Sequence, residues 1–170
     1  MARLTGVFLD TSVLLGGTID VGPSSRAAQA VMDAIADGRV RKPRTAWHCC
    51  LEFYAVATRL PEELRLAPVD ALQLLEEEVL GRLEVVDLPA DRRLLFLRSA
   101  VAERVAGGRL YDAHIAEIAR RSGSGVIVTD NVRHFRGGPG TTVRVLSAVE
   151  FAAELAEEVV RPATEMTVGL

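Results

Sequence analysis

Short apolar runs alternate with longer segments of helical periodicity along the chain. The runs at 6–10 and 126–130 both end in an aspartate, and each predicts a buried strand. Weaker runs at 43–46, 83–88 and 143–146 predict three more strands. Strands that alternate with helices are typical of an α/β fold with a mostly parallel central sheet.

Between these runs, apolar residues recur every three or four positions, which predicts helices. Capping and breaking residues such as Gly38, Pro61 and Pro68 bound them. The predicted helices cover residues 13–15, 24–37, 47–59, 68–80, 91–105, 111–121 and 148–159. In two of them the spacing predicts the inward-facing residues: Leu72, Leu75 and Val79 in one, and Leu94, Leu97, Val101 and Val105 in the other.

The pattern predicts one domain over residues 1–160, a glycine-rich loop at 136–140 and a mobile tail at 161–170. Apolar residues form 49% of the chain and the mean hydropathy is +0.20, which excludes a disordered protein. No apolar run approaches the roughly 20 residues of a membrane span. The first six residues do not resemble a secretory signal, and Cys49 and Cys50 are adjacent, so we expect a cytoplasmic protein without a disulfide framework.

Four acidic residues are bounded by core-forming sequence. Asp10 and Asp130 each end a predicted buried strand, and the carboxyl ends of parallel strands meet at one edge of a sheet. Glu52 lies one turn from apolar positions of its helix, and Asp112 lies near the start of another helix. We therefore expect all four to be partly buried and to share one pocket. Their repulsion favours a bound cation, and oxygen ligands favour Mg²⁺ or Mn²⁺.

Each of these acids also has a simpler interpretation. Asp10 and Asp112 are common helix-capping residues, Asp130 suits a turn, and Glu52 has Arg59 and other arginines as possible partners. A zinc site at His48, Cys49 and Cys50 lacks the usual spacing between cysteines, which favours packed or reactive thiols. The combination of four such acids favours a catalytic pocket over these separate roles.

Four segments in order resemble the successive motifs of PIN-domain nucleases, and in particular the VapC-type toxins of bacterial toxin–antitoxin pairs. They are residues 9–15 (LDTSVLL), 51–59 (LEFYAVATR), 110–116 (LYDAHIA) and 128–131 (VTDN), with His134 and Phe135 following. The resemblance runs from the first strand to about Phe151. It implies a three-layer PIN-like sandwich around a mostly parallel sheet of four to five short strands, flanked by helices.

The resemblance also implies Mg²⁺- or Mn²⁺-dependent endoribonuclease activity. It maps both the catalytic acids and the metal ligands onto Asp10, Glu52, Asp112 and Asp130. Family members commonly form homodimers and are silenced by a cognate antitoxin protein, so both partners are expected here beside the RNA substrate. An alternative function is a non-catalytic PIN-like module that binds RNA or another protein.

Further residues are candidates for supporting roles. Thr129 matches a small hydroxyl residue that precedes the last acid, and Thr11 follows the first acid; both are predicted to support the site. Arg44, Arg133 and His134 are hypothesised to contact the RNA backbone, although solvated loop charges are an equal alternative.

Overall fold

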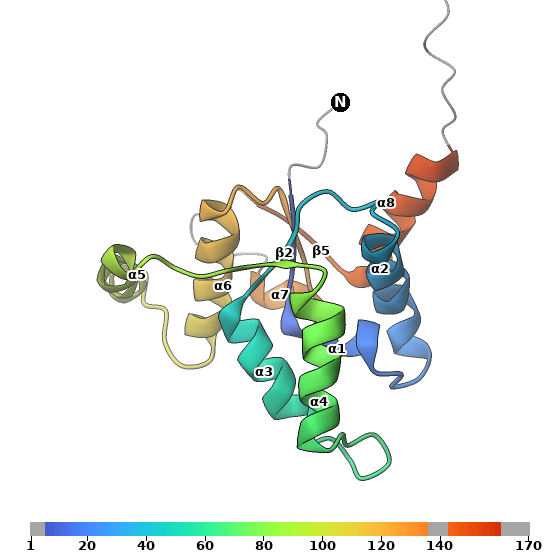
Figure 1. Cartoon of the computed structure of the whole chain (residues 1–170). Helices are drawn as coiled ribbons and strands as arrows, with labels where there is room; N and C mark the ends of the chain where they lie inside the picture. The colour runs from blue at the N-terminus through green and yellow to red at the C-terminus, as the bar shows by residue number, and fades with distance from the viewer. Residues whose placement is uncertain (1–5, 136–142, 161–170) are drawn as a thin grey trace, which may run out of the picture.

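A five-stranded parallel sheet forms the centre of the computed structural model, which describes residues 6–135 and 143–160 (Figure 1). The strands are β1 (Val7–Leu9), β2 (Pro43–Ala46), β3 (Glu84–Val86), β4 (Val126–Val128) and β5 (Arg144–Leu146), in the order β3-β2-β1-β4-β5. All four pairings are parallel. The prediction of a parallel sheet is confirmed, whereas the predicted loop at 136–140 and tail at 161–170 lie outside the described residues.

Helices cover the sheet on both sides. They are α1 (Thr11–Thr18), a 3₁₀ turn η1 (Pro23–Ser25), α2 (Arg26–Ala36), α3 (Trp47–Ala57), α4 (Pro68–Leu74), a π-helical segment η2 (Leu75–Leu80), α5 (Ala90–Ala102), α6 (Arg109–Arg121), α7 (Val132–Phe135) and α8 (Ala148–Val160). Figure 1 shows α2 and α8 on one side of the sheet and α5 and α6 on the other. The predicted three-layer α/β sandwich is thus confirmed.

The central strands are short and apolar because helices cover both of their faces. Every residue of β1 and β4 is buried, so these strands are continuous apolar runs without alternation. The edge strand β3 differs, since Glu84 is exposed and the two valines after it are half-buried. The core therefore centres on β1 and β4, whose last residues Leu9 and Val128 are paired in register.

The helices α1 and α2 pack closely because a glycine lies at their contact. A Cβ atom at Gly17 would lie 2.4 Å from Cγ of Met32 and 2.9 Å from the carbonyl oxygen of Ala28. No side chain larger than hydrogen fits at this contact without moving α2. Since α1 begins directly after β1, this contact also fixes the position of the residues between strand and helix.

The predicted inward face of residues 91–105 is wrong. Leu94, Leu97 and Val101 are exposed, with 78% exposure for Val101, and Ala100 is the buried residue of α5. Val105 is half-buried beyond the end of α5. The periodicity correctly identified an apolar face, but α5 lies at the periphery, where its main contacts are with α6.

A smaller error concerns the helix that begins at Pro68. Leu75 and Val79 are buried as predicted, but Leu72 is exposed and Ala71 is buried in its place. The buried positions are thus spaced by four residues, which suits the wider winding of the π-helical segment η2. Within the described residues, no helix has both the length and the hydropathy needed to cross a bilayer.

We predict that Gly17→Ala destabilises the protein by about 1–3 kcal/mol, because the added methyl group forces α1 away from α2. Urea unfolding followed by circular dichroism measures this change. Gly108→Ala is the matched control, since Gly108 has a helical φ of −59° and open space around it. Equal stability of the two variants would contradict the proposed close contact.

Candidate functional site

The acidic residues lie at the point where the strand order of the sheet reverses. From β1 the chain proceeds to β2 and β3 on one side, and β4 and β5 lie on the other. Ligand sites in such sheets lie at the carboxyl ends of the strands beside the switch point, here β1 and β4. Asp10 and Thr129 are the first residues beyond these two strands, so both lie at that position.

Asp10 is a buried carboxylate held by hydroxyl groups. Its side chain is 5% exposed, and its Oδ2 accepts hydrogen bonds from Thr129 Oγ1 at 2.8 Å and Ser12 Oγ at 3.2 Å. Asp10 occupies the N-cap position of α1, yet its side chain makes no capping hydrogen bond. The capping interpretation therefore does not account for this carboxylate, which points to the hydroxyls of α1 and of the segment after β4.

Burial raises the pKa of Asp10 above its ordinary value of 3.8, because water no longer solvates the charged form. Hydrogen bonds from Thr129, the Thr11 backbone and Ser12 oppose this effect, and the charge of Glu52 adds to it. A cation beside Asp10 would stabilise its charged form against both the desolvation and the repulsion from Glu52, so this carboxylate is well suited to bind a metal.

Glu52 lies near two other acids although its own side chain is exposed. Its Oε2 accepts a hydrogen bond of 2.6 Å from Thr11 Oγ1, which links α3 to the start of α1. The charge of Glu52 raises the pKa of both Asp10 and Asp112. Thr11, rather than Arg59, is thus the partner that orients Glu52.

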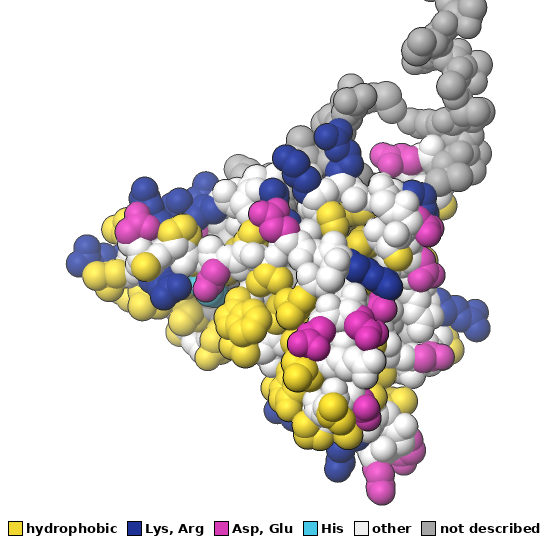
Figure 2. All heavy atoms as spheres, in the orientation of Figure 1, with side chains coloured by type: hydrophobic (Ala, Val, Ile, Leu, Met, Phe, Trp, Pro, Cys, Tyr) yellow, Lys and Arg dark blue, Asp and Glu magenta, His cyan; other side chains and the backbone are white. Residues whose placement is uncertain are grey.

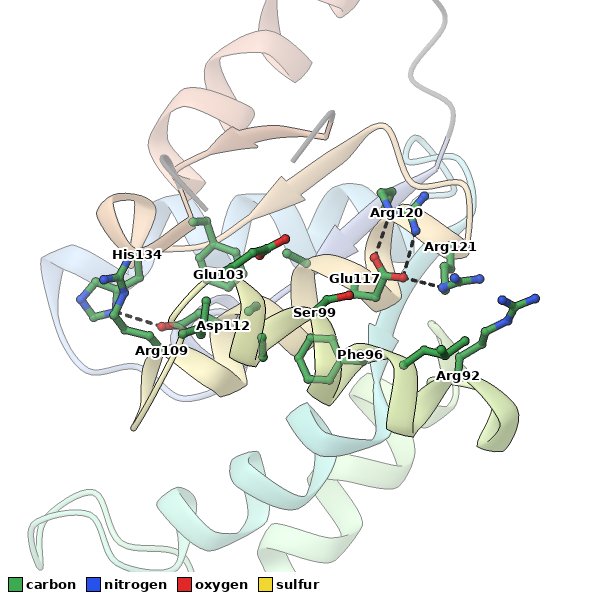
Figure 3. A pocket seen from close by; sticks show the side chains of 16 residues that line it. Arg92, Phe96, Ser99, Glu103, Arg109, Asp112, Glu117, Arg120, Arg121 and His134 are labelled. Carbon is green, nitrogen blue, oxygen red and sulfur yellow. Dashed lines mark hydrogen bonds and ion pairs between the residues drawn. The ribbon is translucent and has the colours of Figure 1, made fainter. Parts of the chain in front are cut away.

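Asp112 lies in the first turn of α6, three residues after it begins, with Gly108 at the N-cap position. Burial raises its pKa and is the largest influence on it, while His134 and Arg109 act in the opposite direction. His134 Nδ1 lies 3.3 Å from Asp112 Oδ2, and Figure 3 shows His134 and Arg109 beside this carboxylate. The N-cap interpretation of Asp112 is therefore wrong.

Asp130 is exposed in the bend between β4 and α7. Its backbone N–H donates to Ser12 Oγ at 3.0 Å, and the N–H of Asn131 donates to Thr129 Oγ1 at 3.1 Å. The same hydroxyls that hold Asp10 therefore also position the backbone of Asp130. The turn interpretation describes this backbone well and leaves the carboxylate available to solvent.

The expectation that all four acids are partly buried is correct for Asp10 and Asp112 and wrong for Glu52 and Asp130. Glu52 is exposed although it reaches Thr11 of α1, and Asp130 lies beyond the end of its strand, so apolar sequence neighbours do not cover either side chain. Among the described residues, no three His, Cys, Asp or Glu side chains lie together closely enough to hold a metal ion.

The donor set nevertheless suits a hard cation. The carboxylates and hydroxyls around Asp10 supply only oxygen atoms, the ligands that Mg²⁺ and Mn²⁺ prefer. Within the described part of the chain, the hydrogen-bond partners of Asp10 and Glu52 are neutral hydroxyl and backbone groups, which leave the negative charge uncompensated. Oxygen chemistry, burial and unbalanced charge thus all fit a divalent cation at this position.

The three hypothesised RNA contacts lie in different places. Arg44 Nε lies 2.7 Å from Glu84 Oε2, and its guanidinium also donates to the carbonyl of Ser122, which precedes β4. Arg44 is therefore at the amino end of the sheet, away from the acids. Arg133 and His134 are both exposed on α7, and His134 contacts Asp112 directly.

The two cysteines are packed thiols. Both are buried and free, and burial raises the pKa of Cys49 to about 12 and that of Cys50 to about 11. Thiols with such pKa values stay protonated at neutral pH, which makes them unreactive. The neighbouring His48 stacks on the ring of Tyr111 at a centroid distance of 5.2 Å, so packing accounts for all three residues.

Ser12 and Arg109 are parts of this site that sequence reasoning missed. Ser12 bonds both Asp10 and the backbone of Asp130, and its position two residues after Asp10 was a signal for this role. Arg109 lies three residues before Asp112 on α6, a spacing that places both on one helix face.

Comparisons with known proteins agree with this geometry. A family model described as a PIN domain matches residues 6–133. The chain is 38% identical over 90 residues to Ribonuclease VapC27 of Mycobacterium tuberculosis, a match over 48% of this chain and 63% of that relative. The chain thus spans less than two thirds of the length of that protein.

Two solved structures share the fold. PAE2754 from Pyrobaculum aerophilum superposes with a TM-score of 0.61 at 20% identity, over 92% of this chain and 99% of the other. DNA-bound VapBC from Salmonella typhimurium superposes with a TM-score of 0.57 at 21% identity, over 85% and 98%. At these identities the similarity concerns the fold alone.

We predict that Asp10→Asn stabilises the metal-free protein at neutral pH. Because the pKa of Asp10 is higher in the folded state, the folded protein binds this proton more tightly than the unfolded chain does. Stability is therefore lost as the pH rises above the ordinary value of 3.8, and an uncharged amide avoids this loss. Thermal unfolding in EDTA should show a higher midpoint for the variant, with a difference that narrows as the pH is lowered.

The control for this experiment is Asp130→Asn, which removes an exposed carboxylate and should change stability by no more than about 0.5 kcal/mol. Added Mg²⁺ should stabilise the wild type more than Asp10→Asn, since binding to the folded state raises its stability. A lower midpoint for Asp10→Asn in EDTA would contradict the burial argument.

Proposed function

The chain belongs to the PIN-domain family, and from this premise we propose that it is a metal-dependent endoribonuclease that hydrolyses RNA phosphodiester bonds. The observation that carries this proposal is the buried carboxylate of Asp10 at the switch point of the sheet, beside Glu52 and Asp112. Its hydroxyl partners orient it without neutralising its charge. The similarity to Ribonuclease VapC27 supports the choice of RNA as substrate.

In this proposal Asp10, Glu52, Asp112 and Asp130 hold Mg²⁺ or Mn²⁺. Such a cation, when bound, polarises the phosphodiester and lowers the pKa of a bound water. Thr129 and Ser12 keep the Asp10 carboxylate in one orientation by donating to its Oδ2. Thr11 fixes Glu52 through its hydroxyl, so that Glu52 has one oxygen left to orient an attacking water.

We further propose that the protein is the toxin of a toxin–antitoxin pair and acts in the cytoplasm. Solved structures with this fold include a VapBC assembly, and the curated relative is named a VapC ribonuclease. An antitoxin that silences this chain would place basic side chains opposite the exposed Glu52 and Asp130, where they replace the cation. Buried, unpaired Cys49 and Cys50 suit a reducing compartment.

A homodimer is the quaternary structure that we propose. Exposed apolar side chains gather on one surface, here called the apolar face. Trp47 and Leu51 of α3, Leu97 of α5 and Tyr111 of α6 line one hollow there, and Tyr54 lies one turn from Leu51 on α3. Figure 2 shows hydrophobic side chains gathered over this side of the molecule. The inner side of α3 is also apolar, so apart from His48 and Glu52 this helix presents apolar side chains both to the core and to solvent, and such a helix is normally covered on both sides.

The shape and charge of the apolar face suit a second copy of the chain. A cavity of about 430 Å³ opens beside Trp47 and Leu51, so the face carries both protruding rings and a hollow. A twofold axis brings such features together in pairs. The charges at the rim, Asp87 and Arg93, lie 3.5 Å apart and balance one another, so two copies meet without net repulsion.

We predict that the purified protein cleaves a mixed RNA pool with Mg²⁺ and that EDTA abolishes the cleavage. Asp10→Asn should remove activity, because no other carboxylate of the site is as deeply buried. Thr129→Val should lower the rate by about 10–100-fold while leaving the protein folded, since it keeps the shape of the side chain and deletes the hydroxyl that orients Asp10 and bonds the Asn131 N–H. Gel analysis of end-labelled RNA measures both effects.

Glu78→Gln is the control, since Glu78 lies on η2, away from the acids, and pairs with Arg82. Cleavage that persists in EDTA and in Asp10→Asn would contradict the metal-dependent site. Folded wild-type protein that binds RNA but cleaves none in the pool would favour the non-catalytic binding module.

We predict that Leu51→Glu gives a monomer where the wild type is a dimer. A charge at the centre of the apolar face must be desolvated if two copies meet there. Light scattering after size-exclusion chromatography measures the mass directly. Val149→Glu is the matched control, because Val149 is also exposed but lies on α8, which is far from α3 in Figure 1. A dimeric Leu51→Glu variant would refute this interface.

A further inference from the structure

A second cavity, of about 500 Å³, runs between α5 and α6 from the acidic site to the far end of α6. Asp112 and His134 line one end of it, and Arg92, Arg120 and Arg121 line the other, as Figure 3 shows. We refer to this space as the arginine cavity. One of the proposed catalytic acids is thus part of its wall.

The charge of the arginine cavity is positive at the end remote from the acids. Glu117 lies at that end and accepts hydrogen bonds from Arg120 Nε and Nη2, each at 2.9 Å, and from Arg121 Nε. One carboxylate is shared by two guanidinium groups, and Arg92 lies beside them. Arg92 Nε lies 3.3 Å from Asp91 Oδ2, so three positive and two negative charges meet there, and each guanidinium has further N–H groups for an anion.

The floor of the arginine cavity is apolar and includes an aromatic ring. Leu95, Phe96, Ala100 and Phe135 line it, and the ring of Phe96 is tilted against His114 at a centroid distance of 5.2 Å. A groove that joins arginines to an aromatic platform is typical of proteins that bind single-stranded nucleic acid. The arginines contact phosphates there and the ring stacks on a base.

The length of the arginine cavity matches a short stretch of an RNA strand. Asp112 and Arg121 are nine residues apart on α6, which corresponds to about 14 Å along the helix axis. The rise along the axis of a stacked strand is roughly 3.4 Å per nucleotide and an unstacked strand is more extended, so no more than about four nucleotides span this distance. A strand whose scissile phosphate lies at Asp112 therefore reaches Arg121 within a few nucleotides.

We propose that the arginine cavity binds the single-stranded RNA segment next to the cleaved bond. The inference rests on the proposed ribonuclease function and adds to it the path of the substrate. Arg92 and Arg121 contact the phosphates, Phe96 stacks on a base, and Glu117 limits the affinity by neutralising part of the positive charge. The cavity thereby selects an unpaired strand, because only unstacked bases reach the apolar floor.

The test uses Arg92→Ala and Arg121→Ala in the full-length protein. Fluorescence anisotropy with a labelled single-stranded RNA of about 12 nucleotides measures affinity over about 50–200 mM salt. Each variant should bind about three- to tenfold more weakly, and the slope of log affinity against log salt should fall by about 0.7 per lost phosphate contact. Arg98 lies on α5 as Arg92 does, but outside the arginine cavity, so Arg98→Ala should bind the RNA with wild-type affinity.

Glu117→Gln distinguishes an electrostatic role of Glu117 in RNA binding from a structural role in the fold. Removal of this charge should tighten RNA binding and steepen the salt slope, whereas damage to the fold would weaken binding. Unchanged affinity in both arginine variants, with RNA cleavage intact, would overturn the inference and leave the ribonuclease proposal standing; an acidic peptide would then be the better occupant. A wild-type protein that neither binds nor cleaves RNA would overturn both.

Discussion

The burial of one carboxylate constrains the rest of this structure. Asp10 is 5% exposed and is held by hydroxyl groups that orient it without cancelling its charge. Desolvation makes the charged form costly and raises the pKa of Asp10, and the hydrogen bonds to its carboxylate act in the opposite direction. Positions of this kind are more often functional than stabilising, because a purely structural role is served better by an apolar side chain. The burial of Asp10 thus agrees with its proposed role as a metal ligand.

Two features of the scaffold hold this carboxylate. The register between β1 and β4 places Thr129 beside Asp10, and the contact of Gly17 with α2 sets how α1 leaves the strand. The start of α1 in turn supplies Thr11 and Ser12, which connect Asp10 to α3 and to the segment after β4. A small movement of α1 therefore disturbs three acids together, although only one of them is deeply buried.

Sequence patterns predicted the layers and strands of this fold because apolar periodicity reports burial directly. They predicted the position of Asp10 for the same reason, since it ends a continuous apolar run. They failed where burial depends on tertiary placement: Leu94 and Val101 form a regular apolar face that the chain leaves exposed, and Glu52 is exposed despite apolar neighbours. Periodicity identifies which face of a helix is apolar, but it cannot say whether the core or a partner covers it.

The wrong prediction for the burial of α5 bears directly on the surroundings of Asp112 on α6. A helix that contributed Leu94 and Val101 to the core would close the space along α6, and the arginine cavity would not exist. Its peripheral position leaves Asp112 open at one end of a cavity and Arg121 at the other. The peripheral position of α5 thus accounts both for its exposed apolar face and for the open space beside Asp112. For the proposed ribonuclease, this open space is what would give an RNA strand access to Asp112.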